Sequence, residues 1–123
     1  MPGIAGLISK QPPDRCRRLV EQMVASMQHE KFYVSGVHDA PDLGVYAGWV
    51  ALEGSPAQFQ PVASERGDVT LLFAGEFFSD RPLHKDVSWL LRDYEKHGDS
   101  FVANLNGLFS GLLIDRSDRK SVV

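Results

Sequence analysis

The sequence has 123 residues, which is the length of one ordinary domain, and 43% of them are hydrophobic and 24% charged. This composition excludes a disordered, collagen-like or low-complexity chain. The formal net charge of -3 excludes a basic surface for nucleic acid or anionic lipid, and no apolar run is long enough to span a membrane. The first ten residues lack the charged and long apolar regions of a signal peptide, so we expect a soluble, cytoplasmic protein.

The amino-terminal third predicts a strand followed by a helix. Residues 3–9 form a short apolar run without helical period, which indicates a buried strand. Asp14 is a candidate helix N-cap, and apolar residues spaced by three and four predict an amphipathic helix over 15–29. Cys16, the only cysteine, lies on the apolar stripe of this helix. We therefore expect a small buried residue rather than a nucleophile, and no intrachain disulfide.

The middle of the chain loses the helical period. Residues 32–52 predict two strands joined by a turn at 39–42, where aspartate and proline gather. Residues 53–68 are rich in Gly, Ser, Pro and Gln and predict a long surface connection.

The last part returns to alternating strands and helix. Residues 69–78 predict a central strand ending near Gly75, and residues 87–98 predict a helix closed by His97-Gly98. A short helical turn is expected over 100–105, a strand over 108–114, and the start of another at 121–123. The order strand, helix, strands, helix, strand predicts a single α+β layered domain rather than repeated βαβ units.

Local catalytic signatures are missing. The sequence contains no dinucleotide-binding glycine motif, no phosphate-binding loop, no nucleophile elbow and no H-E-x-x-H motif. The histidines lie far apart, without the spacing of metal ligands: His29, His38, His84 and His97. We therefore expect no metal and no cofactor.

Several stretches, in order along the chain, resemble class II glutamine amidotransferases, the N-terminal-nucleophile hydrolases. The nearest resemblance is to the glutaminase domain of asparagine synthetase. The matching stretches are MPGIAGLIS at 1–9, Met27 with His29, Gln60-Pro61, FAGEFF at 73–78, Asp86, Tyr94 to Gly98, and LNGLF at 105–109.

This resemblance implies an αββα sandwich of which residues 1–123 supply a part, as one glutaminase-like domain truncated on its C-terminal side. The S-G-G-x-D-S motif of the synthetase half is missing. Strand edges left unpaired would be templates for association, so we expect a homodimer. A further expected partner is an amide-forming synthetase domain of the same or another chain.

The resemblance also assigns site positions. In the family, a cysteine after the initiator methionine is the nucleophile, and its own amine is the base. A glycine N–H and the preceding asparagine stabilise the oxyanion, an arginine holds the glutamine carboxylate, and an aspartate holds its α-amine. This sequence has Pro2 at the nucleophile position, Ala74 and Gly75 at the oxyanion positions, and no arginine near Trp49. Asp86 matches the aspartate, although a helix cap explains it equally well.

We therefore expect a degenerate, catalytically inactive domain of an asparagine-synthetase-type, ATP-dependent amide-forming protein, with a structural or docking role. It would keep no catalytic residue, and only Asp86 and Gly75 as vestiges of substrate binding. Two alternatives remain: an active amidohydrolase that uses other residues, or an enzyme that uses an N-terminal Pro2. A stand-alone interaction module is a third.

Overall fold

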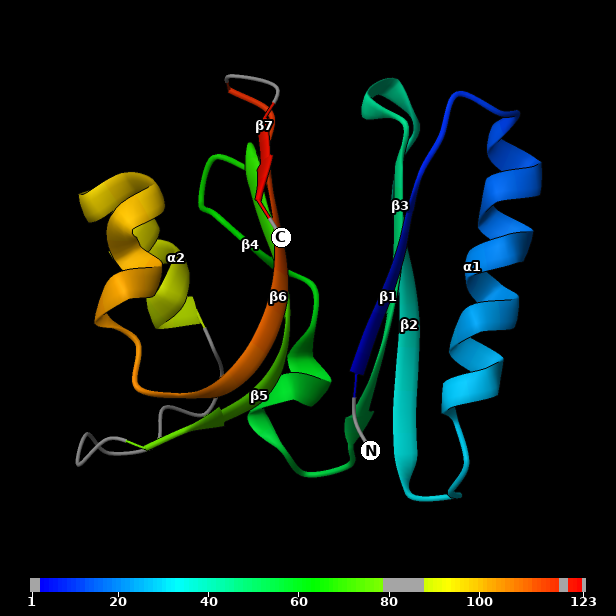
Figure 1. Ribbon diagram of the computed structural model, residues 1–123, viewed down its shortest axis with the longest axis horizontal. Helices are drawn as coiled ribbons and strands as arrows, with labels where there is room; N and C mark the ends of the chain where they lie inside the picture. Colours follow the sequence, from blue (N-terminus) through cyan, green and yellow to red (C-terminus); the bar gives the residue numbers. More distant parts are fainter. Residues whose placement is uncertain (1–2, 79–87, 118–119, 123) are drawn as a thin grey trace.

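The computed structural model describes residues 3–78, 88–117 and 120–122, and it has a mixed α+β architecture. Figure 1 shows four layers in the order helix, sheet, sheet, helix. All strand pairs are antiparallel. The first sheet has the order β1 (Gly3–Ile8), β3 (Val45–Leu52), β2 (Tyr33–Ala40), and the second has the order β4 (Val62–Ala63), β5 (Val69–Phe77), β6 (Gly107–Asp115), β7 (Lys120–Val122).

The helices cover the outer faces of the sheets. Helix α1 (Pro13–Met27) packs on the first sheet and α2 (Ser88–His97) packs on the second (Figure 1). Short 3-10 helices connect the remaining elements: η1 (Pro41–Leu43), η2 (Pro56–Phe59) and η3 (Gly98–Asn104). Neither α-helix of the described part of the chain is long and apolar enough to cross a membrane.

Strand β3 is buried on both faces because its side chains alternate between two cores. Tyr46 and Val50 pack under α1 with Cys16, while Ala47 and Trp49 belong to the core between the sheets. A third core joins α2 to the second sheet, so each layer boundary has its own apolar cluster. The expectation that Cys16 is a buried apolar residue is confirmed, since its exposure is 0%.

Most predicted elements are present, but the predicted cap of the first helix is wrong. Helix α1 starts at Pro13, its N-cap is Pro12, and no side chain caps it. Proline suits the first helical position because the missing N–H would have no intrahelical partner there. Asp14 lies instead in the first turn, where its charge favours the positive end of the helix dipole.

The prediction of a surface connection over 53–68 is also wrong in part, because Gln60 and Ser64 are buried. The Gln60 amide Nε2 donates to the Ala57 carbonyl at 2.7 Å, and its Oε1 accepts from the N–H of Phe73. Strand β4 begins only at Val62, so the Gln60 side chain accepts the hydrogen bond of a β5 backbone group that a longer β4 would have paired. This side chain therefore anchors the connection to the central strand.

Helix α2 is tied to the second sheet by a buried polar contact. The Tyr94 hydroxyl donates to Asp115 Oδ2 at 2.6 Å, and both residues are under 10% exposed. The other oxygen, Oδ1, accepts from the Ser117 N–H at 2.9 Å and from its hydroxyl at 2.5 Å. Gly98 follows the helix with φ of 63°, as the predicted glycine stop requires.

We expect Tyr94→Phe to lower the free energy of unfolding by about 1.5–3 kcal/mol, because it removes a buried hydrogen bond to a carboxylate. Urea unfolding followed by circular dichroism measures the change. Tyr33→Phe is the control, since among the described residues Tyr33 accepts a side-chain hydrogen bond through its backbone carbonyl and makes none through its hydroxyl. Equal losses in the two variants would contradict the role of the Tyr94–Asp115 bond.

Candidate functional site

The residues expected at the site separate into two groups. Pro2, at the nucleophile position, and Asp86, at the position that would hold an α-amine, lie outside the described residues. Ala74 and Gly75 lie on strand β5, and Trp49 lies on strand β3.

Ala74 and Gly75 form part of the β5–β6 ladder, opposite Ser110 and Phe109. The Phe78 N–H donates to the Asn106 carbonyl, and the Arg116 N–H donates to the Asp68 carbonyl. Both bonds join an even-numbered residue on the β5 side to β6. Because the backbone groups of successive residues in a strand point to opposite sides, the Ala74 N–H points toward β6 and the Gly75 N–H points away from it. The Gly75 N–H therefore lies outside that ladder, on the side where a backbone oxyanion donor would have to be.

Glycine at position 75 also has a structural cause. Its φ is 148°, and an added Cβ would lie 2.3 Å from the Leu108 carbonyl oxygen and 2.5 Å from the Phe109 Cα. No residue with a side chain fits this approach between β5 and β6. Ala74, beside it, is buried and carries a methyl group with no hydrogen-bond donor.

Trp49 fills the inner face of the first sheet. It is paired with Ile4 on β1 and Gly36 on β2, and it is 6% exposed. A Cβ on Gly36 would lie 2.7 Å from the indole Cζ2, so the ring occupies the volume above this glycine. Among the described residues, the indole N–H has no hydrogen-bond partner.

The importance of Gly36 was missed in the sequence because the predicted turn at 39–42 is displaced by two residues. In the structure β2 continues to Ala40, which pairs with Val45, so the hairpin turns over 41–44 and Gly36 lies opposite Trp49. Counting outward from 39–42 would have placed Gly36 opposite Val45. A glycine directly across from a tryptophan indicates that the ring lies flat over the neighbouring strand.

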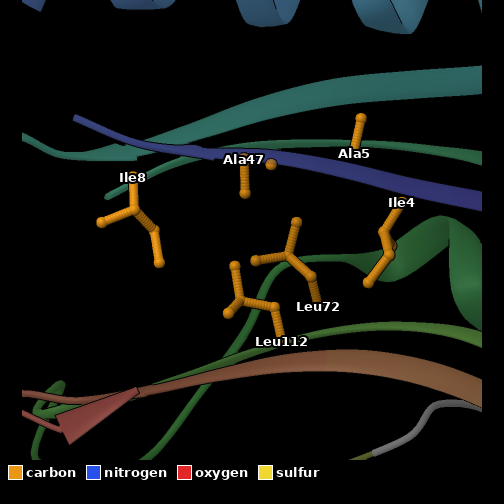
Figure 2. A pocket seen from close by; sticks show the side chains of 7 residues that line it. Ile4, Ala5, Ile8, Ala47, Leu72 and Leu112 are labelled. Atoms are coloured by element: carbon orange, nitrogen blue, oxygen red, sulfur yellow. The ribbon is translucent and has the colours of Figure 1, made fainter. Parts of the chain in front are cut away.

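Two cavities among the described residues are apolar. One of about 410 Å³ lies between the sheets and is shown in Figure 2, where Ile4, Ile8, Leu72 and Leu112 point into a common space. A second, of about 490 Å³, is lined by apolar residues around Phe73 and Phe109, with Ser110 as its polar member. No titratable side chain lines either cavity, and no metal-ligand cluster occurs within residues 3–78, 88–117 and 120–122.

Two ion pairs lie near the end of β2, where the chain turns toward β3. Arg17 contacts Asp39 at 2.5 Å, and Arg116 pairs with Asp42, which connects β6 to the turn after β2. Half-buried His38 lies on β2 opposite Ala47, on the inner face. Burial lowers the pKa of His38, and the Arg116 charge lowers it further, against the opposite effect of Asp39.

The lowered pKa of His38 predicts a dependence of stability on pH. The folded state favours neutral His38. Its contribution to the free energy of unfolding is therefore fully present above the ordinary histidine pKa of 6.5, and it is lost as the pH falls through the lower pKa of the folded state. Over that pH range we expect the free energy of unfolding, measured by urea unfolding, to fall less steeply with decreasing pH in His38→Gln than in the unchanged protein. His29→Gln, at an exposed histidine, is the control, and an unchanged slope in the His38 variant would contradict the effect.

No family model matches the chain. The chain is similar to glutamine-hydrolyzing asparagine synthetase 2 of Lotus japonicus, with 25% identity over 135 aligned residues that cover 100% of this chain and 23% of the relative. The nodule and root asparagine synthetases of Pisum sativum are each 24% identical, with the same coverage. The chain thus has distant homology to plant asparagine synthetases and spans less than a quarter of their length.

Proposed function

We propose that this chain is a degenerate, catalytically inactive relative of the glutaminase domain of asparagine synthetases. Its role would be to support, or to dock on, an amide-forming synthetase domain in the same or another chain. Homology to glutamine-hydrolyzing asparagine synthetases along the whole chain supports the family part of this proposal. The helix, sheet, sheet, helix order in Figure 1 supports a partial N-terminal-nucleophile hydrolase sandwich.

The observation that carries the proposed loss of activity is the buried indole of Trp49. The resemblance implies an arginine in this region to hold the glutamine carboxylate. A guanidinium offers five N–H donors in a fork that pairs with both carboxylate oxygens, whereas an indole offers one. Without that clamp the scissile amide would not be held in place, and the positioning advantage of several kcal/mol is lost.

Two further losses point the same way. The Ala74 methyl cannot supply the side-chain oxyanion donor, whose removal costs about 100- to 1,000-fold in a working hydrolase. Pro2 supplies no thiol, and loss of a nucleophile costs on the order of a millionfold. The apolar linings of both cavities favour this proposal over an active amidohydrolase or an N-terminal-proline enzyme.

The proposal is tested by titrating the purified chain with glutamine in a calorimeter. We expect no saturable heat, because the groups that would hold the carboxylate and the amide oxygen are replaced by apolar ones. D-glutamine is the control for heat of dilution. A saturable heat specific to L-glutamine would contradict the proposed loss of the site and favour an active hydrolase.

We also expect that Pro2→Cys does not restore glutaminase activity. The variant supplies the sulfur, and removal of Met1 would free the amine that acts as base, but the clamp and the side-chain oxyanion donor stay missing. Glutamate release from millimolar glutamine measures the activity, with mass spectrometry to confirm loss of Met1. Turnover within the ~1 to 1,000 per second typical of enzymes would overturn the proposal.

A further inference from the structure

Strand β1 has one open edge. It pairs with β3 on one side, and no strand of the described part of the chain pairs with its other side. The Ser9 N–H donates to the Gly44 carbonyl, and the Glu53 N–H donates to the Phe32 carbonyl. The first bond shows that odd-numbered residues of β1 bond to even-numbered residues of β3, and the second agrees, because it shows that odd-numbered residues of β3 bond to β2. The N–H and C=O groups of Ile4, Gly6 and Ile8 therefore point away from β3, toward the open edge.

The same three residues border the cavity between the sheets. Ile4, Gly6 and Ile8 line the space of about 410 Å³, with Leu72 and Leu112 as its floor on the second sheet. In Figure 2 the Ile4 and Ile8 side chains point into this space, while Ala5 points toward α1. Ile8 is 70% exposed, an unusual position for a large apolar side chain at a sheet edge.

This edge carries none of the usual protection against pairing. Natural edge strands are blocked by charges, proline, bulges or an inward-pointing lysine, and Gly3–Ile8 contains no such residue. Unpaired backbone groups beside an apolar space favour an added strand, because its main chain makes the hydrogen bonds and its alternate side chains fill the space. The occupant is therefore an extended segment with apolar alternation.

The sequence of β1 fits a second copy of itself. In an antiparallel pair with its two-fold axis at Gly6, Ile4 lies opposite Ile8 of the second copy, and Gly6 lies opposite Gly6. This is the two-fold register in which all three outward-pointing residues meet outward-pointing partners. Directly opposite Cβ atoms lie about 4.5–5.5 Å apart, so Ile8 of one copy reaches the apolar space beside Ile4 of the other.

We propose that the chain self-associates through the open edge of β1, in an antiparallel pair centred on Gly6 that joins the first sheets of two copies into one. The sequence analysis expected a homodimer, and this inference assigns its surface. It does not depend on the loss of glutaminase activity, so binding of glutamine would leave it standing.

Analytical ultracentrifugation of the full chain across micromolar concentrations tests the proposal together with two variants. Ile8→Lys places a charge in the paired apolar space, and we expect it to raise the dimer dissociation constant about tenfold or more. Leu108→Lys is the matched control, because Leu108 is 74% exposed on β6, in the second sheet. It should leave the dissociation constant unchanged.

Gly6→Cys tests whether the two β1 strands pair with Gly6 opposite Gly6. It tests the proposal even if Ile8→Lys weakens folding. An added Cβ at Gly6 meets only the Tyr46 carbonyl oxygen, at 3.6 Å, so a side chain fits. Facing Cα atoms in such a pair lie about 5.5 Å apart, within disulfide range. Mild oxidation should then give a covalent dimer, Leu108→Cys should not, and buried Cys16 should not contribute.

The outcomes divide cleanly. A dimer weakened by Ile8→Lys and captured through Gly6→Cys supports the proposal. A dimer that is not captured through Gly6→Cys overturns it and assigns association to another surface. A chain that stays monomeric also overturns it, and leaves the β1 edge to a strand of a different segment or protein.

Discussion

Close packing of the two sheets depends on small side chains along the inner face of the first one. Ala40, Ala47 and Ala51 leave room there for the larger residues of β5 and β6. Trp49 has the largest side chain in this core, and it fits because Gly36 on the neighbouring strand has no side chain. Packed sheets lie about 10 Å apart, so one bulky residue must be matched by one small neighbour. The α1 side repeats this logic, since Gly48 lets the helix approach β3.

The same packing explains why the proposed remnant of a glutamine site is apolar. A buried arginine or asparagine without its substrate would leave charge or hydrogen-bonding groups uncompensated, at a cost of several kcal/mol for an ion. The buried methyl of Ala74 carries no such group, and the buried indole of Trp49 leaves one neutral N–H without a partner among the described residues, but no charge. Gly75 stays for a different reason, because β5 and β6 approach too closely there for any Cβ.

Periodicity in the sequence predicted the helices and strands whose burial follows a regular spacing along the chain. The amphipathic spacing located both helices, and apolar runs located β1, β3, β5 and β6, because burial of one face selects residue types at a regular interval. It could not predict the burial of Gln60, whose role arises from a hydrogen bond to Phe73, thirteen positions away. The site positions came from the resemblance alone, and the pairing of Gly36 with Trp49 required the hairpin register.

The anchoring of Gln60 divides the connection between β3 and β5 into a fixed centre and two open tips. Gly54 and Gly67 sit at these tips with φ of 82° and 73°, and an added Cβ at either would meet nothing within 4 Å. Insertions are tolerated best where the backbone is exposed and makes few contacts. The chain can therefore gain or lose length at either tip while Gln60 holds β5 in register. This gives the domain two places where a new recognition loop could evolve without disturbing the core.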